Sequence, residues 1–202
     1  MNPILLDIPM PIETPRLLLR PPQAGDGADL NAAILESFEE LQTWMPWMEG
    51  NPPPVEKSEE NVRRAYAQWI LREDLRLSIF DRATGRLASS TGLHRIRWNL
   101  PSFEIGYWAR SSFVGRGYIT EAVNALTRFT FQQLGAKRVE IRCDFGNHRS
   151  ISVAKRLGFE LEGTLRQESR RYQPPHELRD TEIFSRLHSD RLPELDVKWP
   201  RA

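Results

Sequence analysis

The sequence predicts an α/β fold built on a mixed sheet whose first half is antiparallel. Three strand-like runs, 75–80, 87–94 and 103–109, follow one another with only turns between them, as in an antiparallel meander. After residue 118 the apolar residues recur at a helical period, and helical segments then alternate with strand-like ones. This order of elements indicates a sheet that is covered by helices.

The N-terminal third predicts one strand and two helices separated by a loop. Residues 16–20 form a short strand stopped by two prolines, and Asp26 can cap a helix that runs to about Phe38. Residues 41–48 are aromatic and broken by proline, which predicts a loop that either lines a pocket or covers the core. Ser58 begins the second helix. Its apolar stripe at helical spacing, expected to face the core, consists of Val62, Ala65, Tyr66, Trp69 and Ile70.

The second half of the chain predicts two helices and the strand between them. The first helix runs from Tyr118 to about Leu134 and is followed by Gly135 as a C-cap residue. Residues 139–143 alternate between apolar and polar, which is typical of a half-buried strand. The second helix covers 147–157 and is closed by Gly158.

Two closing strands are expected over 159–165 and 178–187. The sequence contains no internal repeat and no low-complexity segment that would mark a domain boundary. We therefore expect a single domain over residues 1–190, followed by a loosely ordered C-terminal tail over 191–202.

Composition argues against several classes of protein. The 28 Lys and Arg residues nearly balance 27 Asp and Glu, so nucleic acid is not expected as a direct partner. Cys143 is the only cysteine, which excludes an internal disulfide, and His94, His148, His176 and His188 have no metal-ligand spacing, so no metal is expected. No apolar run approaches the ~20 residues that span a bilayer, and no signal peptide is recognisable. We expect a cytoplasmic monomer or homodimer.

The turn at 114–119 carries the main functional signal. Gly115 and Gly117 let the backbone approach a ligand closely, and a helix begins immediately afterwards with several amides that lack intrahelical partners. These amides and the helix dipole favour a phosphate group, and Arg116 adds positive charge. The turn lacks the Walker ending, and Thr120 stands where the dinucleotide fingerprint needs glycine. A plain tight turn is the alternative interpretation.

Four motifs in order along the chain resemble those of the GNAT N-acetyltransferases. Residues 104–122 resemble the acyl-CoA signature of this superfamily, and residues 147–159 resemble its second signature. Residues 13–20 and 161–166 resemble the branch of ribosomal-protein N-terminal acetyltransferases, the RimJ/RimL type. The resemblance covers nearly the whole chain, from about Ile12 to Leu187.

The resemblance implies a GNAT-like central mixed sheet, mostly antiparallel, splayed by an acyl-CoA wedge and with helices on both faces. Acetyl-CoA is the implied co-substrate, held by strand backbone, by the turn amides and by one asparagine near the thioester. The implied binding residues are Trp108, Ala109, Arg110, Gly115, Arg116, Gly117, Tyr118, Ile119, Thr120 and Asn147. Many relatives have a tyrosine general acid where this chain has Ala154, and Ser150 is implied near the sulfur instead.

Transfer to an amine also needs a base and an acceptor pocket. Glu104 is the first candidate base, because it precedes the turn on an alternating strand, although an ordinary outward-facing carboxylate is an equal reading. Glu168 is a weaker candidate. Ser150 is expected either to protonate the thiolate or to cap its own helix. The expected acceptor pocket consists of the aromatic residues Trp44, Trp47 and Tyr107.

The resulting hypothesis is an acetyl-CoA-dependent N-acetyltransferase in which a primary amine attacks the thioester directly. A weak base suffices if the acceptor is a protein α-amine, such as that of a ribosomal protein, because its pKa of about 7.7–8.0 leaves some of it neutral. Two alternatives stay open. The acceptor is a small amine such as a polyamine, an amino acid or an aminoglycoside, or the chain is a catalytically silent acyl-CoA-binding regulatory module.

Overall fold

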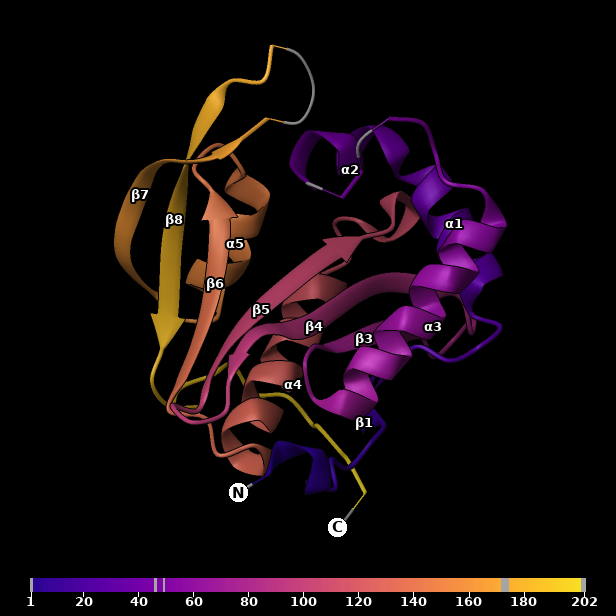
Figure 1. The fold of residues 1–202 in the computed structure, drawn as a ribbon. Helices are drawn as coiled ribbons and strands as arrows, with labels where there is room; N and C mark the ends of the chain where they lie inside the picture. Colours follow the sequence, from indigo (N-terminus) through magenta and orange to yellow (C-terminus); the bar gives the residue numbers. More distant parts are fainter. Residues whose placement is uncertain (1, 46, 49, 172–174, 201–202) are drawn as a thin grey trace.

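One eight-stranded sheet runs through the computed structural model, which describes residues 2–45, 47–48, 50–171 and 175–200 (Figure 1). The strand order is β1-β2-β3-β4-β5-β6-β8-β7. The strands are β1 (Ile12–Glu13), β2 (Leu17–Arg20), β3 (Leu75–Asp81), β4 (Leu87–Arg97), β5 (Ser102–Ala109), β6 (Arg138–Asp144), β7 (Glu160–Arg170) and β8 (Leu178–Arg186). The predicted meander is β3, β4 and β5, while β1 is a short strand that the sequence pattern did not indicate.

Among the strand pairs of the described residues, only β5 and β6 are parallel, so the predicted mixed and mostly antiparallel sheet is confirmed. The two strands are paired over three residues, Ser102–Glu104 with Arg138–Glu140. Beyond Glu104, β5 continues to Ala109 and β6 to Asp144 without pairing to each other. The sheet therefore opens between these two strands, as the expected splay requires, and one edge of β5 is left without a strand partner.

Helices cover both faces of the sheet, as predicted. The helices are α1 (Gly27–Glu36), α2 (Phe38–Trp44), α3 (Val55–Leu71), α4 (Tyr118–Gln133) and α5 (His148–Arg156), with short 3-10 turns η1 (Pro3–Leu5) and η2 (Ser111–Phe113). Helices α1 and α3 pack on each other and on β3 and β4, whereas α4 lies behind the sheet in Figure 1. Helix α5 packs against α4 and β6.

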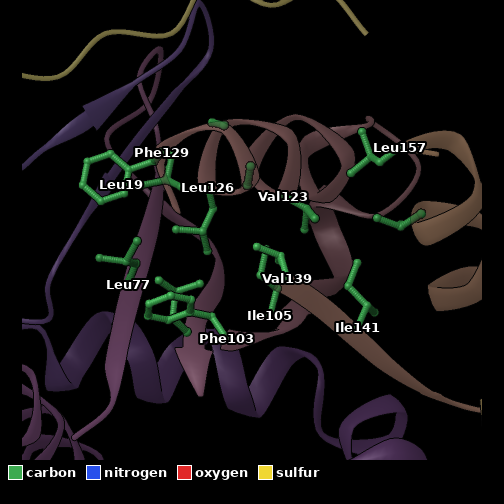
Figure 2. Close-up of a cluster of buried hydrophobic side chains, with 14 of the residues drawn as sticks. Leu19, Leu77, Phe103, Ile105, Val123, Leu126, Phe129, Val139, Ile141 and Leu157 are labelled. Carbon is green, nitrogen blue, oxygen red and sulfur yellow. The ribbon is translucent and has the colours of Figure 1, made fainter. Parts of the chain in front are cut away.

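The main core lies between α4 and the sheet (Figure 2). Leu126 and Phe129 of α4 are both 1% exposed, since the apolar stripe predicted for this helix faces the strands. The strands contribute fully buried residues from their alternating inward positions, among them Leu77, Phe103 and Ile105. This layer holds the start of α4, and with it the glycine turn, in a set position against β5.

Three expectations for the N-terminal third were wrong. Residues 41–44 belong to α2 and not to a loop. Helix α3 begins at Val55, three residues before Ser58, because Pro54 takes the position before the helix and proline pre-organises a helix start. In the predicted stripe, Tyr66 and Ile70 are 44% and 46% exposed, since only one edge of the stripe faces the sheet and α1.

The C-terminal segment is packed against the domain, so the expectation of a loosely ordered tail was wrong. Leu192 is 6% exposed, and the Trp199 ring meets Phe129 edge-on at 5.3 Å between centroids. The backbones of Lys198 and Glu13 exchange hydrogen bonds of 2.7 and 2.8 Å. The apolar residues of this segment are too widely spaced for a local pattern, and they pack against the main core, which is distant in sequence. The division of the chain at residue 190 stays a prediction.

Within the described ranges, none of the helices is both long enough and apolar enough to cross a membrane.

Candidate active site

The glycine turn has the conformation that the sequence pattern required. Gly115 and Gly117 have φ values of 79° and 78°, in the left-handed region that glycine adopts without strain. Helix α4 starts at Tyr118. The first amide of the helix with a helical hydrogen bond is that of Glu121, which donates to the Gly117 carbonyl at 3.0 Å. In the part of the chain that is described, the amides of 115–120 bond to no backbone carbonyl of the turn. They are available to an anion.

Arg16 holds this turn from the opposite end of the chain. Its guanidinium donates to the Arg116 carbonyl at 2.9 Å and pairs with the Glu121 carboxylate at 2.5 Å. The Glu121 carboxylate is 8% exposed and also accepts a hydrogen bond from Thr14 at 2.6 Å. Sequence reasoning missed Arg16 as part of the site, although it lies in a motif that was noted, because the motif does not reveal its partners.

A cavity of about 820 Å³ lies where β5 and β6 separate, and the glycine turn forms one of its walls. This volume falls within the range of roughly 300–1,000 Å³ that is usual for small-molecule sites. The Arg110 amide bonds to Ala88 of β4, and the Gly106 carbonyl accepts from Thr91 of β4. Because backbone groups alternate along a strand, those of Tyr107 and Ala109 point the other way, toward the open side.

Three side chains from different elements converge on one wall of the cavity. The Ser150 hydroxyl lies 2.9 Å from the Tyr107 hydroxyl and 3.1 Å from the Cys143 thiol. Burial raises the pKa of Tyr107 well above its ordinary value, and it raises the pKa of the Cys143 thiol to about 11. All three groups therefore stay protonated near neutral pH. Cys143 was not predicted at the site, since it is one inward residue of an ordinary alternating strand.

The side chain of Asn147 caps α5, so the alternative in which Ser150 caps its own helix was wrong. The Asn147 Oδ1 accepts from the Ser150 amide at 3.1 Å and caps α5. A hydrogen bond from Asn147 to a ligand would therefore come from Nδ2. The Ser150 hydroxyl itself is not used in this cap and faces the cavity.

Glu104 lies at the point where the strands separate, and it lines the cavity. Its side chain is 17% exposed, and one oxygen is buried without a hydrogen bond, although Arg95 Nε lies 3.2 Å away outside hydrogen-bond geometry. Burial raises the pKa of Glu104, while the positive charges of Arg95 and Arg142 counteract this shift. A carboxylate with a raised pKa is the state expected of a general base.

Glu168, the weaker candidate base, has other partners. It lies on β7, where its carboxylate pairs with Arg142 at 3.1 Å and accepts from Thr181 at 3.1 Å. It does not line the cavity, whereas Arg142 does. Glu104 is therefore the better placed of the two carboxylates.

The cavity brings together all the predicted site residues except Arg110, Arg116 and Trp47. Arg110 turns its side chain to Glu36 of α1 at 2.7 Å. The Arg116 guanidinium lies 5.1 Å from the centre of the Phe113 ring. Trp47 is 51% exposed, and its ring lies beside the Trp108 ring. The roles assigned to the residues that line the cavity stay predictions.

At the α2 side of the cavity, α2 contacts both α5 and β8. Glu40 of α2 pairs with Arg149 of α5 at 2.9 Å. Arg179 of β8 donates to the Thr43 carbonyl at 3.3 Å and lies 5.7 Å from the centre of the Trp44 ring. Trp44 lines the cavity, so the aromatic run at 41–48 does contribute to a pocket wall. Among the residues that the structure covers, no three His, Cys, Asp or Glu side chains are grouped as a metal would need.

Comparisons with curated proteins find acetyltransferases among the relatives of this chain. The ribosomal-protein-serine acetyltransferase of Escherichia coli K12 is 32% identical over an alignment of 139 residues, and the match covers 62% of this chain and 71% of the relative. Bacillus subtilis YdaF, whose name assigns it provisionally to the ribosomal N-acetyltransferases, is 33% identical over 153 residues. That match covers 74% of this chain and 79% of YdaF.

Solved structures share the fold. RimL, a ribosomal α-N-protein acetyltransferase solved with coenzyme A, superposes with a TM-score of 0.81 over 89% of this chain and 99% of its own, at 22% identity. The microcin self-immunity acetyltransferase MccE, solved with acetyl-CoA and AMP, gives a TM-score of 0.78 at 23% identity, over 86% and 93% of the two chains. The family model described as the acetyltransferase (GNAT) domain matches residues 16–160. Because this match spans well over half of the sequence, the chain belongs to the GNAT family of acetyltransferases.

Proposed function

We propose that this chain transfers the acetyl group of acetyl-CoA to the N-terminal α-amine of a protein, such as a ribosomal protein, by direct attack of the amine. The observation that carries this proposal is the single cavity into which the glycine turn, Glu104 and Ser150 all open. The amides of the turn, a candidate base and a hydroxyl thereby face one shared cavity. The curated relatives support the same class of acceptor.

The residues present fit acetyl-CoA, which supplies an activated acetyl thioester. The turn offers unpaired amides to the pyrophosphate. The open edge of β5 offers the backbone groups of Tyr107 and Ala109 to the amides of the pantetheine arm. Arg16 holds the turn in place for this contact through its bond to the Arg116 carbonyl.

Two groups in the cavity are suited to move protons. Glu104 takes a proton from the attacking amine, and its raised pKa makes it a better acceptor than an exposed carboxylate. The hydroxyl of Ser150 lies where it can donate a proton to the departing thiolate and recover one from water in the cavity. Tyr107, which burial keeps protonated, donates to the Ser150 carbonyl at 3.1 Å and lies 2.9 Å from the Ser150 hydroxyl, so it holds Ser150 in place.

A protein α-amine suits this modest base. Its reference pKa of about 7.7–8.0 leaves a useful neutral fraction at neutral pH, whereas a lysine side chain at about 10.4 needs much more help. The Trp44 ring on the acceptor side provides an apolar surface for the first residue of a peptide.

A free-thiol assay tests the proposal. Peptides with a free N-terminal serine or alanine should release coenzyme A thiol, and matched peptides that carry a blocked N-terminus and an internal lysine should not. Mass spectrometry should place the acetyl group on the α-nitrogen. Turnover of polyamines, amino acids or aminoglycosides in place of peptides would refute the protein acceptor. Binding of acetyl-CoA without thiol release for any amine would refute the transferase reaction.

A further inference from the structure

His94 of β4 lies beside Glu104, although it is not part of the cavity wall. The two residues are direct partners across the β4–β5 pair, so their side chains share a face with Cβ atoms about 4.5–5.5 Å apart. The imidazole lies over two glycines. A Cβ at Gly106 would be 2.9 Å from the ring Cδ2, and one at Gly92 would be 3.0 Å from Nε2. Larger residues at either position would displace the ring.

Asp74 holds the other side of this ring. Its carboxylate lies 2.6 Å from the His94 Nδ1, which favours the tautomer with the proton on Nδ1 and a lone pair on Nε2. The side chains of His94 and Asp74 are 31% and 29% exposed, so water reaches both. The pair therefore extends from the neighbourhood of Glu104 to solvent.

Glu104 must lose the proton that it gains in every turnover, and a neighbouring group that exchanges protons with water can take it. Of the charged groups that act on it, Arg95 and Arg142 have no acceptor atom. Glu140 already accepts two hydrogen bonds, at 2.9 and 3.0 Å, from an arginine of its own strand. His94 offers Nε2, which can take up a proton and release it again, and its side chain is 31% exposed to water.

We propose that His94, oriented by Asp74, is a positioning and relay residue that carries the proton from Glu104 to solvent; this inference rests on the proposed transferase function. The ammonium of the acceptor gives a proton to the Glu104 carboxylate. Neutral His94 takes that proton on Nε2, directly or through one water, and restores the carboxylate. The imidazolium then releases its Nε2 proton to bulk water and returns to the neutral tautomer.

Several other charges face this pair. Asp74 and Arg76 approach from the β3 side, and the Arg76 guanidinium is tied to the Asn61 carbonyl at 2.8 Å. Arg95 comes from β4, and Arg142 and Glu140 come from β6. A positive charge on His94 lowers the pKa of Glu104, so the two groups are electrostatically coupled.

Two variants test the relay against a purely structural role. His94→Gln can still bond to Asp74 through its amide but cannot carry a proton. Its kcat should fall at least about tenfold with an unchanged peptide KM. His94→Ala should recover activity when imidazole is added to the assay, since the small molecule replaces the missing proton carrier. The matched control is His188→Gln, because His188 lies 3.7 Å from Asp190 in a similar exposed pair outside the cavity.

A second readout does not depend on turnover. In protein labelled with ¹³C at glutamate carboxyl groups, His94→Gln should raise the pKa of Glu104, and His188→Gln should leave it unchanged. Wild-type kcat in His94→Gln, or no imidazole rescue of His94→Ala, would overturn the relay. If the wild-type protein acetylates no amine, the proposed function fails, and an unmoved Glu104 titration in His94→Gln would overturn the coupling separately.

Discussion

Replacing Gly117 by valine tests the contact between the turn and the pyrophosphate. Gly117 has φ 78° and ψ 5°, and a Cβ there would meet only the Arg16 Nη2, at an ordinary 3.6 Å. The cost is therefore conformational, about 1–2 kcal/mol for a non-glycine residue in the left-handed region. If the turn relaxes to escape this strain, its amides point elsewhere. A hydrogen bond to a charged group contributes about 1.5–3 kcal/mol, so the loss of one weakens the Kd roughly 10- to 150-fold.

Isothermal titration calorimetry with acetyl-CoA measures this effect. Gly135→Val is the matched control, because Gly135 also has a positive φ, 65°, has no neighbouring atom within 4 Å of its Cβ position, and follows the other end of α4. Both variants should lose thermal stability, while only Gly117→Val should lose affinity. A Gly117→Val protein that binds acetyl-CoA with the wild-type Kd would refute the phosphate role of the turn.

Three further substitutions probe the rest of the cavity. Glu104→Gln should lower kcat/KM by roughly 10²–10⁴-fold, most at low pH and least at high pH, where the amine loses its proton unaided. Because burial raises the pKa of Glu104, wild-type activity should fall as the pH drops through a value above the ordinary carboxyl range, and an identical pH–rate profile in the variant would remove Glu104 as the base. Tyr107→Phe removes the hydroxyl 2.9 Å from Ser150 and should lower kcat about tenfold or more without changing the Kd of acetyl-CoA; unchanged single-turnover rates would contradict its role in holding Ser150. Trp44→Ala should raise the peptide KM about tenfold, equivalent to about 1.4 kcal/mol, and leave acetyl-CoA binding intact, which steady-state kinetics would check.

Local pattern was a good guide wherever local interactions decide the structure. Alternation located the meander strands, and helical spacing located α4 to within a residue of its observed end at Gln133. The pattern was less reliable where a distant element sets the environment. Tyr66 and Ile70 repeat at helical spacing, yet they are exposed because nothing in the described chain packs over that edge of α3.

The same distinction between local and distant interactions applies to the candidate site. By itself, the sequence determined the glycine turn, the helix that follows it and the acidic residue before it, since backbone conformation and chain order are local properties. Only the tertiary structure decided that β5 and β6 separate after Glu104 and that Arg16, near the N-terminus, donates a hydrogen bond to the turn. It alone also placed the side chains of Tyr107 and Cys143 within hydrogen-bond distance of Ser150. These contacts join residues far apart in sequence, and their geometry depends on how whole strands and helices pack, which no short pattern of residues encodes.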